Sequence, residues 1–238
     1  MSQPGLTAGA RVYLVTVAGL ALGVAGLLWV FDGRVAAGPI TFLALAGLGM
    51  VAHAFPIRAS RHQAYQVTLP FIVIAAAICN VPQLIAFLIL IHAAEQIRVR
   101  RPLYIQAFNL CDHFLSAAAA AVFYERALAL MPATTLSTVE AAMAAGCTFV
   151  VLNRVLLIGV LWTARGLSPA RSGLLRPELL AADLIIIWMS GPMLVLTTQA
   201  GPLMMLVTAG PLFLARPALA ALLAERDQPA PEARANAA

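Results

Sequence analysis

Polar side chains that could bind a ligand or an ion interrupt one of the apolar segments of this chain. The stretch "IQAFNLCDHFLS" (105–116) carries Gln106, Asn109, Asp112, His113 and Ser116. All except Asp112 are spaced by three or four residues, so they share one face of a helix, with Asp112 at its edge. Lipid penalises such a face, so we expect it to point at other helices. Two interpretations stay open: hydrogen bonds that hold helices together, or a pocket for a ligand or ion.

Two further charges lie in apolar sequence. Arg154 lies within "VVLNRVLLIGVLW" and Asp183 within "LLAADLIIIWMSGP". A guanidinium group keeps its proton, so Arg154 needs a buried counter-charge, and Asp112 or Asp183 can supply it. The pair is then either a structural ion pair or part of a site for a polar or anionic ligand. The sequence therefore predicts a buried polar cluster, with these candidate members: Asn80, Asn109, Asp112, His113, Asn153, Arg154 and Asp183.

Motifs typical of enzymes do not appear. The sequence lacks H-E-x-x-H, the phosphate-binding P-loop and G-x-S-x-G. His92 and Glu95 are three residues apart on a predicted helix and could bind a metal. They lie next to the basic "RVRR" at 98–101, so we expect a solvated pair instead. The sequence thus predicts a protein that is not an enzyme, has no metal site, and gives no indication of a cofactor.

The composition places the chain in a bilayer. Hydrophobic residues make up 62% of the 238 residues and charged residues only 11%, against about 25% charged in a soluble domain. Several apolar runs approach the roughly 20 residues that cross a membrane, and they are continuous rather than alternating. We therefore expect an all-α integral membrane protein. All basic residues are arginine and the net charge is +5, which in a membrane protein does not indicate a nucleic-acid partner.

Six membrane spans are expected, at about 12–31, 37–55, 105–128, 141–163, 178–198 and 203–213. A further apolar run, 67–94, is broken by "CNVPQ" at 79–83, where Pro82 disfavours helix. Each half is about 13–14 residues, or roughly 20 Å of helix, which is short of a hydrocarbon core of about 30 Å. The run is either one kinked span or a re-entrant pair that returns to its own side.

Arginine placement favours the re-entrant pair. With a cytoplasmic N-terminus and a returning pair, twelve of the fifteen arginines lie inside, Arg34 and Arg126 lie outside, and Arg154 lies within a span. A single crossing would instead place "RVRR" outside, against the positive-inside rule. We expect about six transmembrane helices plus the broken pair in a bacterial inner membrane, with both termini cytoplasmic.

The order of these segments resembles a known type of membrane region. Two spans ending in "HAFPIRAS" are followed by "VTLPFIVIAAAICNVPQLIAFLILIHAAEQIRVRRPLYIQAFNLCDHFLSAAAAAVFY", "VLNRVLLIGV" and "PLFLARPALAALL". This resembles the N-terminal membrane sensor region of bacterial HD-GYP phosphodiesterase and GGDEF cyclase signalling proteins, over about residues 11–222. The resemblance marks the dipeptide Phe108-Asn109 and a second asparagine, Asn153. It implies sensing or binding at the membrane.

The predicted domain organisation departs from that type of protein. We expect one helical membrane domain over 1–222 and a disordered cytoplasmic tail over 223–238, whose Pro/Ala-rich sequence has few large apolar residues. A catalytic domain is not expected after it. The first functional hypothesis is a stand-alone sensory or ligand-binding module that signals through a protein partner or a second copy. The alternatives are a small-solute transport subunit resembling the substrate-binding components of vitamin importers, and a structural accessory subunit of a membrane complex.

Overall fold

The computed structural model describes residues 6–225 except 56, 59–63 and 66. Its helices are α1 (Ala8–Phe31), α2 (Pro39–Ala54), α3 (Leu69–Ile78), α4 (Val81–Val99), α5 (Leu103–Leu130), α6 (Thr135–Arg165), α7 (Pro169–Ser172), α8 (Pro177–Ala200) and α9 (Met204–Glu225). Between α2 and α3, β1 (Ile57–Arg58) pairs with antiparallel β2 (Ala64–Tyr65). This small ladder is the one addition, within the described residues, to the predicted all-α architecture.

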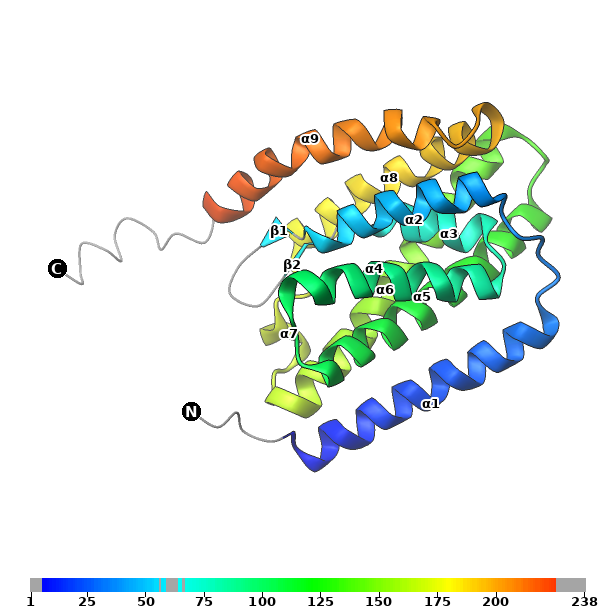
Figure 1. Ribbon diagram of the computed structural model, residues 1–238. Helices are drawn as coiled ribbons and strands as arrows, with labels where there is room; N and C mark the ends of the chain where they lie inside the picture. The colour runs from blue at the N-terminus through cyan, green and yellow to red at the C-terminus, as the bar shows by residue number, and fades with distance from the viewer. Residues whose placement is uncertain (1–5, 56, 59–63, 66, 226–238) are drawn as a thin grey trace.

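The long helices form a bundle (Figure 1). Side-chain contacts mark its two ends. At one end Thr7 Oγ1, before α1, donates to the carbonyl of Thr163 near the end of α6, at 2.9 Å. At the other end Arg34, after α1, pairs with Glu125 near the end of α5, at 3.3 Å. We call the second the Arg34 end and the first, which also holds His53 at the end of α2, the histidine end. Successive helices alternate between the two.

The broken run 67–94 forms two helices that run in opposite directions. His53 contacts Thr68, just before α3, and Glu95, near the end of α4. Both outer ends of the α3–α4 pair therefore lie at the histidine end, while its linker, Cys79–Asn80, lies at the Arg34 end. The predicted break is confirmed, but the halves are unequal, with 10 residues in α3 and 19 in α4.

The linker between α3 and α4 is fixed by polar contacts. The side chain of Asn80 accepts the N–H of Gln83 at 3.1 Å and so caps α4. Asp32 Oδ2, at the end of α1, accepts the N–H of Val81 at 2.7 Å, and Gln83 Nε2 donates to the carbonyl of Ala37 at 2.9 Å. At the start of α4, the Val81 N–H is therefore satisfied by Asp32 and the Gln83 N–H by Asn80, and the Gln83 side chain joins α4 to the α1–α2 connection.

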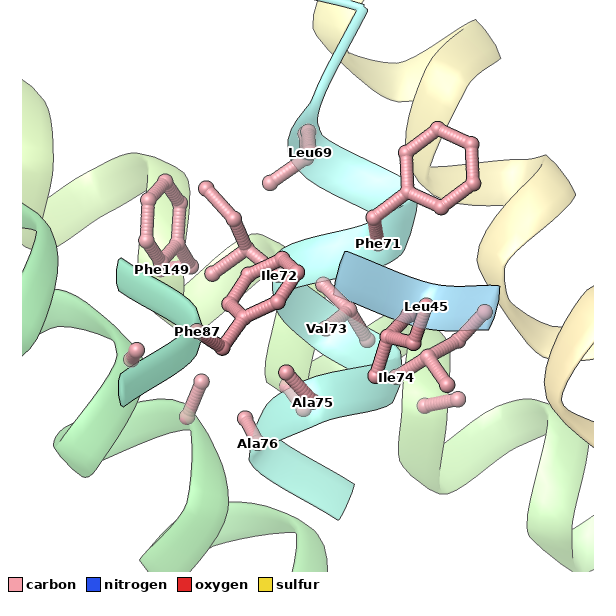
Figure 2. Close-up of a cluster of buried hydrophobic side chains, with 14 of the residues drawn as sticks. Leu45, Leu69, Phe71, Ile72, Val73, Ile74, Ala75, Ala76, Phe87 and Phe149 are labelled. Atoms are coloured by element: carbon pink, nitrogen blue, oxygen red, sulfur yellow. The ribbon is translucent and has the colours of Figure 1, made fainter. Parts of the chain in front are cut away.

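The core is centred on α3 (Figure 2). Each residue from Leu69 to Ala76 is buried, so other parts of the protein surround α3 on every side. Leu45 of α2, Phe87 of α4 and Phe149 of α6 pack around it. At Gly49 of α2, an added Cβ would come within 2.7 Å of the Phe87 ring. The absence of a side chain at Gly49 therefore lets α2 approach α4 closely, whereas a Cβ added at Gly47 would have nothing within 4 Å.

Four described helices are long and apolar enough to cross a membrane, namely α1, α4, α6 and α8. The helices α2, α3 and the segment Met204–Leu214 are apolar but shorter. Large apolar side chains on the outer surface, such as Leu22 of α1 and Trp188 of α8, are mostly exposed, as expected for a surface that contacts lipid. The protein is therefore a multi-pass helical membrane protein.

At the end of the described chain, α9 runs past Pro217 to Glu225. The disordered tail expected over 223–238 stays a prediction, since 226–238 lie outside the described residues.

Candidate functional site

A polar cavity of about 510 Å³ opens towards the histidine end between α5, α6 and α8. Its walls include apolar side chains of α3, α6 and α8. Its polar lining consists of Arg101, Asn109, Asp112, His113, Asn153, Arg154, Arg171, Ser172 and Asp183. The structure thus brings six of the seven candidate residues from the sequence to one cavity, from three helices.

Arg154 pairs with Asp183 rather than with Asp112. Arg154 Nε donates to Asp183 Oδ2 at 3.1 Å, and the same guanidinium group also donates to the backbone carbonyl of Leu174. The Arg154 side chain is 11% exposed and that of Asp183 is 15% exposed. Of the two partners left open by the sequence, the packing of α6 against α8 selects Asp183.

Asp112 has a different set of partners. Its Oδ2 accepts a hydrogen bond from Asn153 Nδ2 at 2.9 Å, and its Oδ1 lies 3.5 Å from Ser116 Oγ, one helical turn away. Asp112 is almost completely buried. The polar stripe predicted on "IQAFNLCDHFLS" therefore faces other helices, and Asp112 belongs to its buried part rather than to its edge.

Asn80 does not belong to this site. The sequence placed Asn80 and Pro82 at the rim of the polar cluster, which is wrong, because both lie at the Arg34 end. Asn80 caps α4, and Pro82 lines a shallow apolar surface together with Pro39 and Phe42. The prediction failed because it assumed a short re-entrant pair whose linker stays inside the bundle.

Beside the cavity, three histidines meet in the core at the histidine end. His53 of α2, His92 of α4 and His113 of α5 each offer a ring nitrogen, and these nitrogens lie within 4.8 Å of one another. All three residues are buried, and so is Glu95. Glu95 Oε1 pairs with Arg101 Nη2 at 3.1 Å. The expectation that His92 and Glu95 form a solvated pair is therefore wrong, because α2 and α5 cover them.

No protein family matches this chain, and the comparisons with curated proteins and with solved structures give no match either. The resemblance to bacterial sensor regions consequently stays a hypothesis.

The sequence missed three participants: His53, Arg101 and Arg171. His53 lies near the end of α2 and is 39 residues from His92, so no helical spacing links them. Arg101 looked like part of a solvated basic run, yet it binds a buried carboxylate. Of the three, only Arg101 could have been found from the sequence, because it lies six residues after its partner Glu95.

Proposed function

We propose that this chain is a membrane-embedded ligand-binding module. It receives a small polar or anionic molecule in the cavity between α5, α6 and α8, and passes the binding event to a protein partner or a second copy. The observation that carries this proposal is the cavity itself. Its volume of about 510 Å³ lies within the range of about 300–1,000 Å³ that is usual for small-molecule sites.

The lining favours a ligand with a negatively charged group. Of its three guanidinium groups, that of Arg101 is paired with Glu95 and that of Arg154 with Asp183, which leaves Arg171 for a negatively charged group of the ligand. Arg154 is held in place by Asp183, and a fixed guanidinium group can bind a carboxylate or phosphate with little reorganisation. Asn109 and Asn153, the two asparagines marked by the resemblance to sensor regions, both line the cavity.

The test is to identify the small molecules that are extracted from the membrane together with the protein. The full chain extracted into native-lipid particles should carry a small molecule that mass spectrometry detects above the level in an unrelated membrane protein. We expect Asn109→Leu and Arg171→Gln to retain at least about tenfold less of it, since each removes a polar group from the lining. Arg165→Gln is the matched control, because Arg165 is exposed near the same end of the bundle and does not line the cavity.

Other outcomes would favour the other two hypotheses. Uptake of the retained molecule that depends on an ATPase partner would identify a transport subunit. The buried charges and the broken α3–α4 run are also compatible with that function. An empty cavity, together with stoichiometric co-purification with a large complex, would identify a structural accessory subunit and defeat the ligand-binding proposal.

The proposal includes an orientation in a bacterial inner membrane. Both termini are cytoplasmic, and six helices cross besides the α3–α4 pair. This pair reaches the Arg34 end and returns through α4 to its own side; the arginine distribution and the opposite directions of α3 and α4 support this. In a chain with its native cysteines replaced, we expect engineered cysteines at Ala59 and Ser168 to react from the cytoplasm and one at Thr135 from outside. Labelling of the 58–62 and 98–101 connections from opposite membrane faces would rule out the returning pair.

A further inference from the structure

The three-histidine cluster contains nitrogens that the protein itself leaves poorly satisfied. His53 Nε2 is buried without a hydrogen bond among the described residues. Its nearest charged neighbour, Glu95 Oε2, is 3.5 Å away, which is beyond the usual hydrogen-bond distance of about 2.7–3.2 Å. A buried polar atom without a partner is destabilising, so a ligand bound to this nitrogen would remove an unfavourable feature of the folded protein.

The other two rings direct nitrogens at each other. His92 Nε2 and His113 Nδ1 are 2.8 Å apart, so without a further partner the two nitrogens share one proton. A zinc–nitrogen bond is about 2.0–2.1 Å long, so two nitrogens on one tetrahedral ion are roughly 3.3 Å apart. Small rotations of the two side chains would therefore place both nitrogens at the separation that one bound ion requires. That ion would displace the shared proton, as metal binding to imidazole does.

Groups around the three rings resemble the outer shell of a metal site. His53 Nδ1 lies 3.2 Å from Thr68 Oγ1; when Nδ1 donates to this hydroxyl, the lone pair of Nε2 faces the cluster. Glu95 Oε2 lies 3.9 Å from His92 Nδ1, and the other oxygen of this carboxylate is paired with Arg101. Metal-binding histidines are commonly oriented by a hydroxyl, carbonyl or carboxylate in this way.

The cluster is also buried between packed helices. His53, His92 and His113 come from three helices, and their ring centroids are 4.6–5.6 Å apart. The apolar side chains of Ile91 and Phe149 are buried beside them. A site on three packed helices holds its ligands closely in place, and imidazole suits first-row divalent cations such as zinc, cobalt, nickel and copper.

We infer that His53, His92 and His113 form a binding site for one first-row divalent cation, with Glu95 as its outer-sphere counter-charge. Three nitrogen ligands leave one tetrahedral position for a water molecule or another group. His113 also lines the polar cavity, so the ion would lie behind one wall of it. The inference does not depend on the proposed ligand, because the histidines, not the cavity, define the site.

The test uses the full chain in detergent, purified with a tag that contains no histidine and stripped with a chelator. Titration with Zn²⁺ or Co²⁺ should show one ion bound per chain. We expect His53→Gln, His92→Gln and His113→Gln each to weaken binding by at least about 100-fold, and Glu95→Gln by about 10–100-fold. His62→Ala removes the remaining histidine of the chain and should change nothing.

Two results would overturn the inference: uptake well below one ion per chain by the wild-type protein, or wild-type affinity in the folded histidine variants. If those variants do not fold, X-ray absorption at the zinc edge of the wild-type protein decides, and fewer than three imidazole ligands would disprove the site. Ion binding is measured without any small molecule, and the small-molecule inventory can be repeated on chelator-treated protein. Failure of the metal site and failure of the proposed function are therefore distinguishable.

Discussion

Replacing Arg154 by leucine should cost about 3–5 kcal/mol of the free energy of unfolding, because removing one member of a buried ion pair deprives the other of its counter-charge. Here that other member is Asp183, of which only 15% of the side chain is exposed. The carbonyl of Leu174 would lose its guanidinium donor as well. Denaturation of the purified protein in mild detergent, followed by circular dichroism, measures the loss.

A double-mutant cycle identifies the partner. Arg154→Leu combined with Asp183→Leu should recover most of the loss, since a well-packed apolar pair can replace a buried ion pair at little cost. Arg154→Leu combined with Asp112→Leu is the matched control and should show little coupling, because Asp112 is bound to Asn153 and not to Arg154. Coupling of equal size in both cycles would mean that the two aspartates share Arg154, and the pairing described above would be wrong.

Asp32 should be the most important carboxylate at the Arg34 end. It receives hydrogen bonds from Arg34 Nε at 2.6 Å and from the N–H of Val81 at 2.7 Å, so it joins α1 to the start of α4. A hydrogen bond to a charged group contributes about 1.5–3 kcal/mol, and we expect Asp32→Asn to destabilise the protein by about that amount. The control is Glu125→Gln, which removes the other acidic partner of Arg34. Glu125 is 53% exposed, so its loss should cost less than about 1 kcal/mol.

Asp32 should also make the free energy of unfolding depend on pH. Burial by itself would raise the pKa of Asp32, but the hydrogen bonds from Arg34 and from the Val81 N–H outweigh it and lower the pKa below its ordinary value. The folded state then binds fewer protons than the unfolded chain. The stabilisation is therefore complete above the unfolded pKa of about 3.9 and is lost as the pH falls through the lower folded pKa. Unfolding curves of the wild-type protein and of Asp32→Asn should converge as the pH falls below about 4; a constant difference would contradict this origin.

Helices and their ends were largely predictable from local sequence. The break at 79–83, the ends of α1 and α2, and the polar face of α5 follow from hydropathy, proline and residue spacing along one segment. These are properties of neighbouring residues, so they need no knowledge of the fold. The lengths of α3 and α4 were less predictable, because the helix begun at Val81 depends on Asp32, 49 residues earlier, as well as on Asn80.

The sequence by itself determined that this is a helical membrane protein with buried charges that must be compensated. Only the tertiary structure decided the partners: Asp183 rather than Asp112 for Arg154, the Arg34 end rather than the cavity for Asn80, and burial rather than solvation for Glu95. The physical reason is that burial energetics demand a counter-charge without specifying which one. Helix packing then selects the partner, and the same packing brings His53 to two histidines that no sequence spacing connects with it.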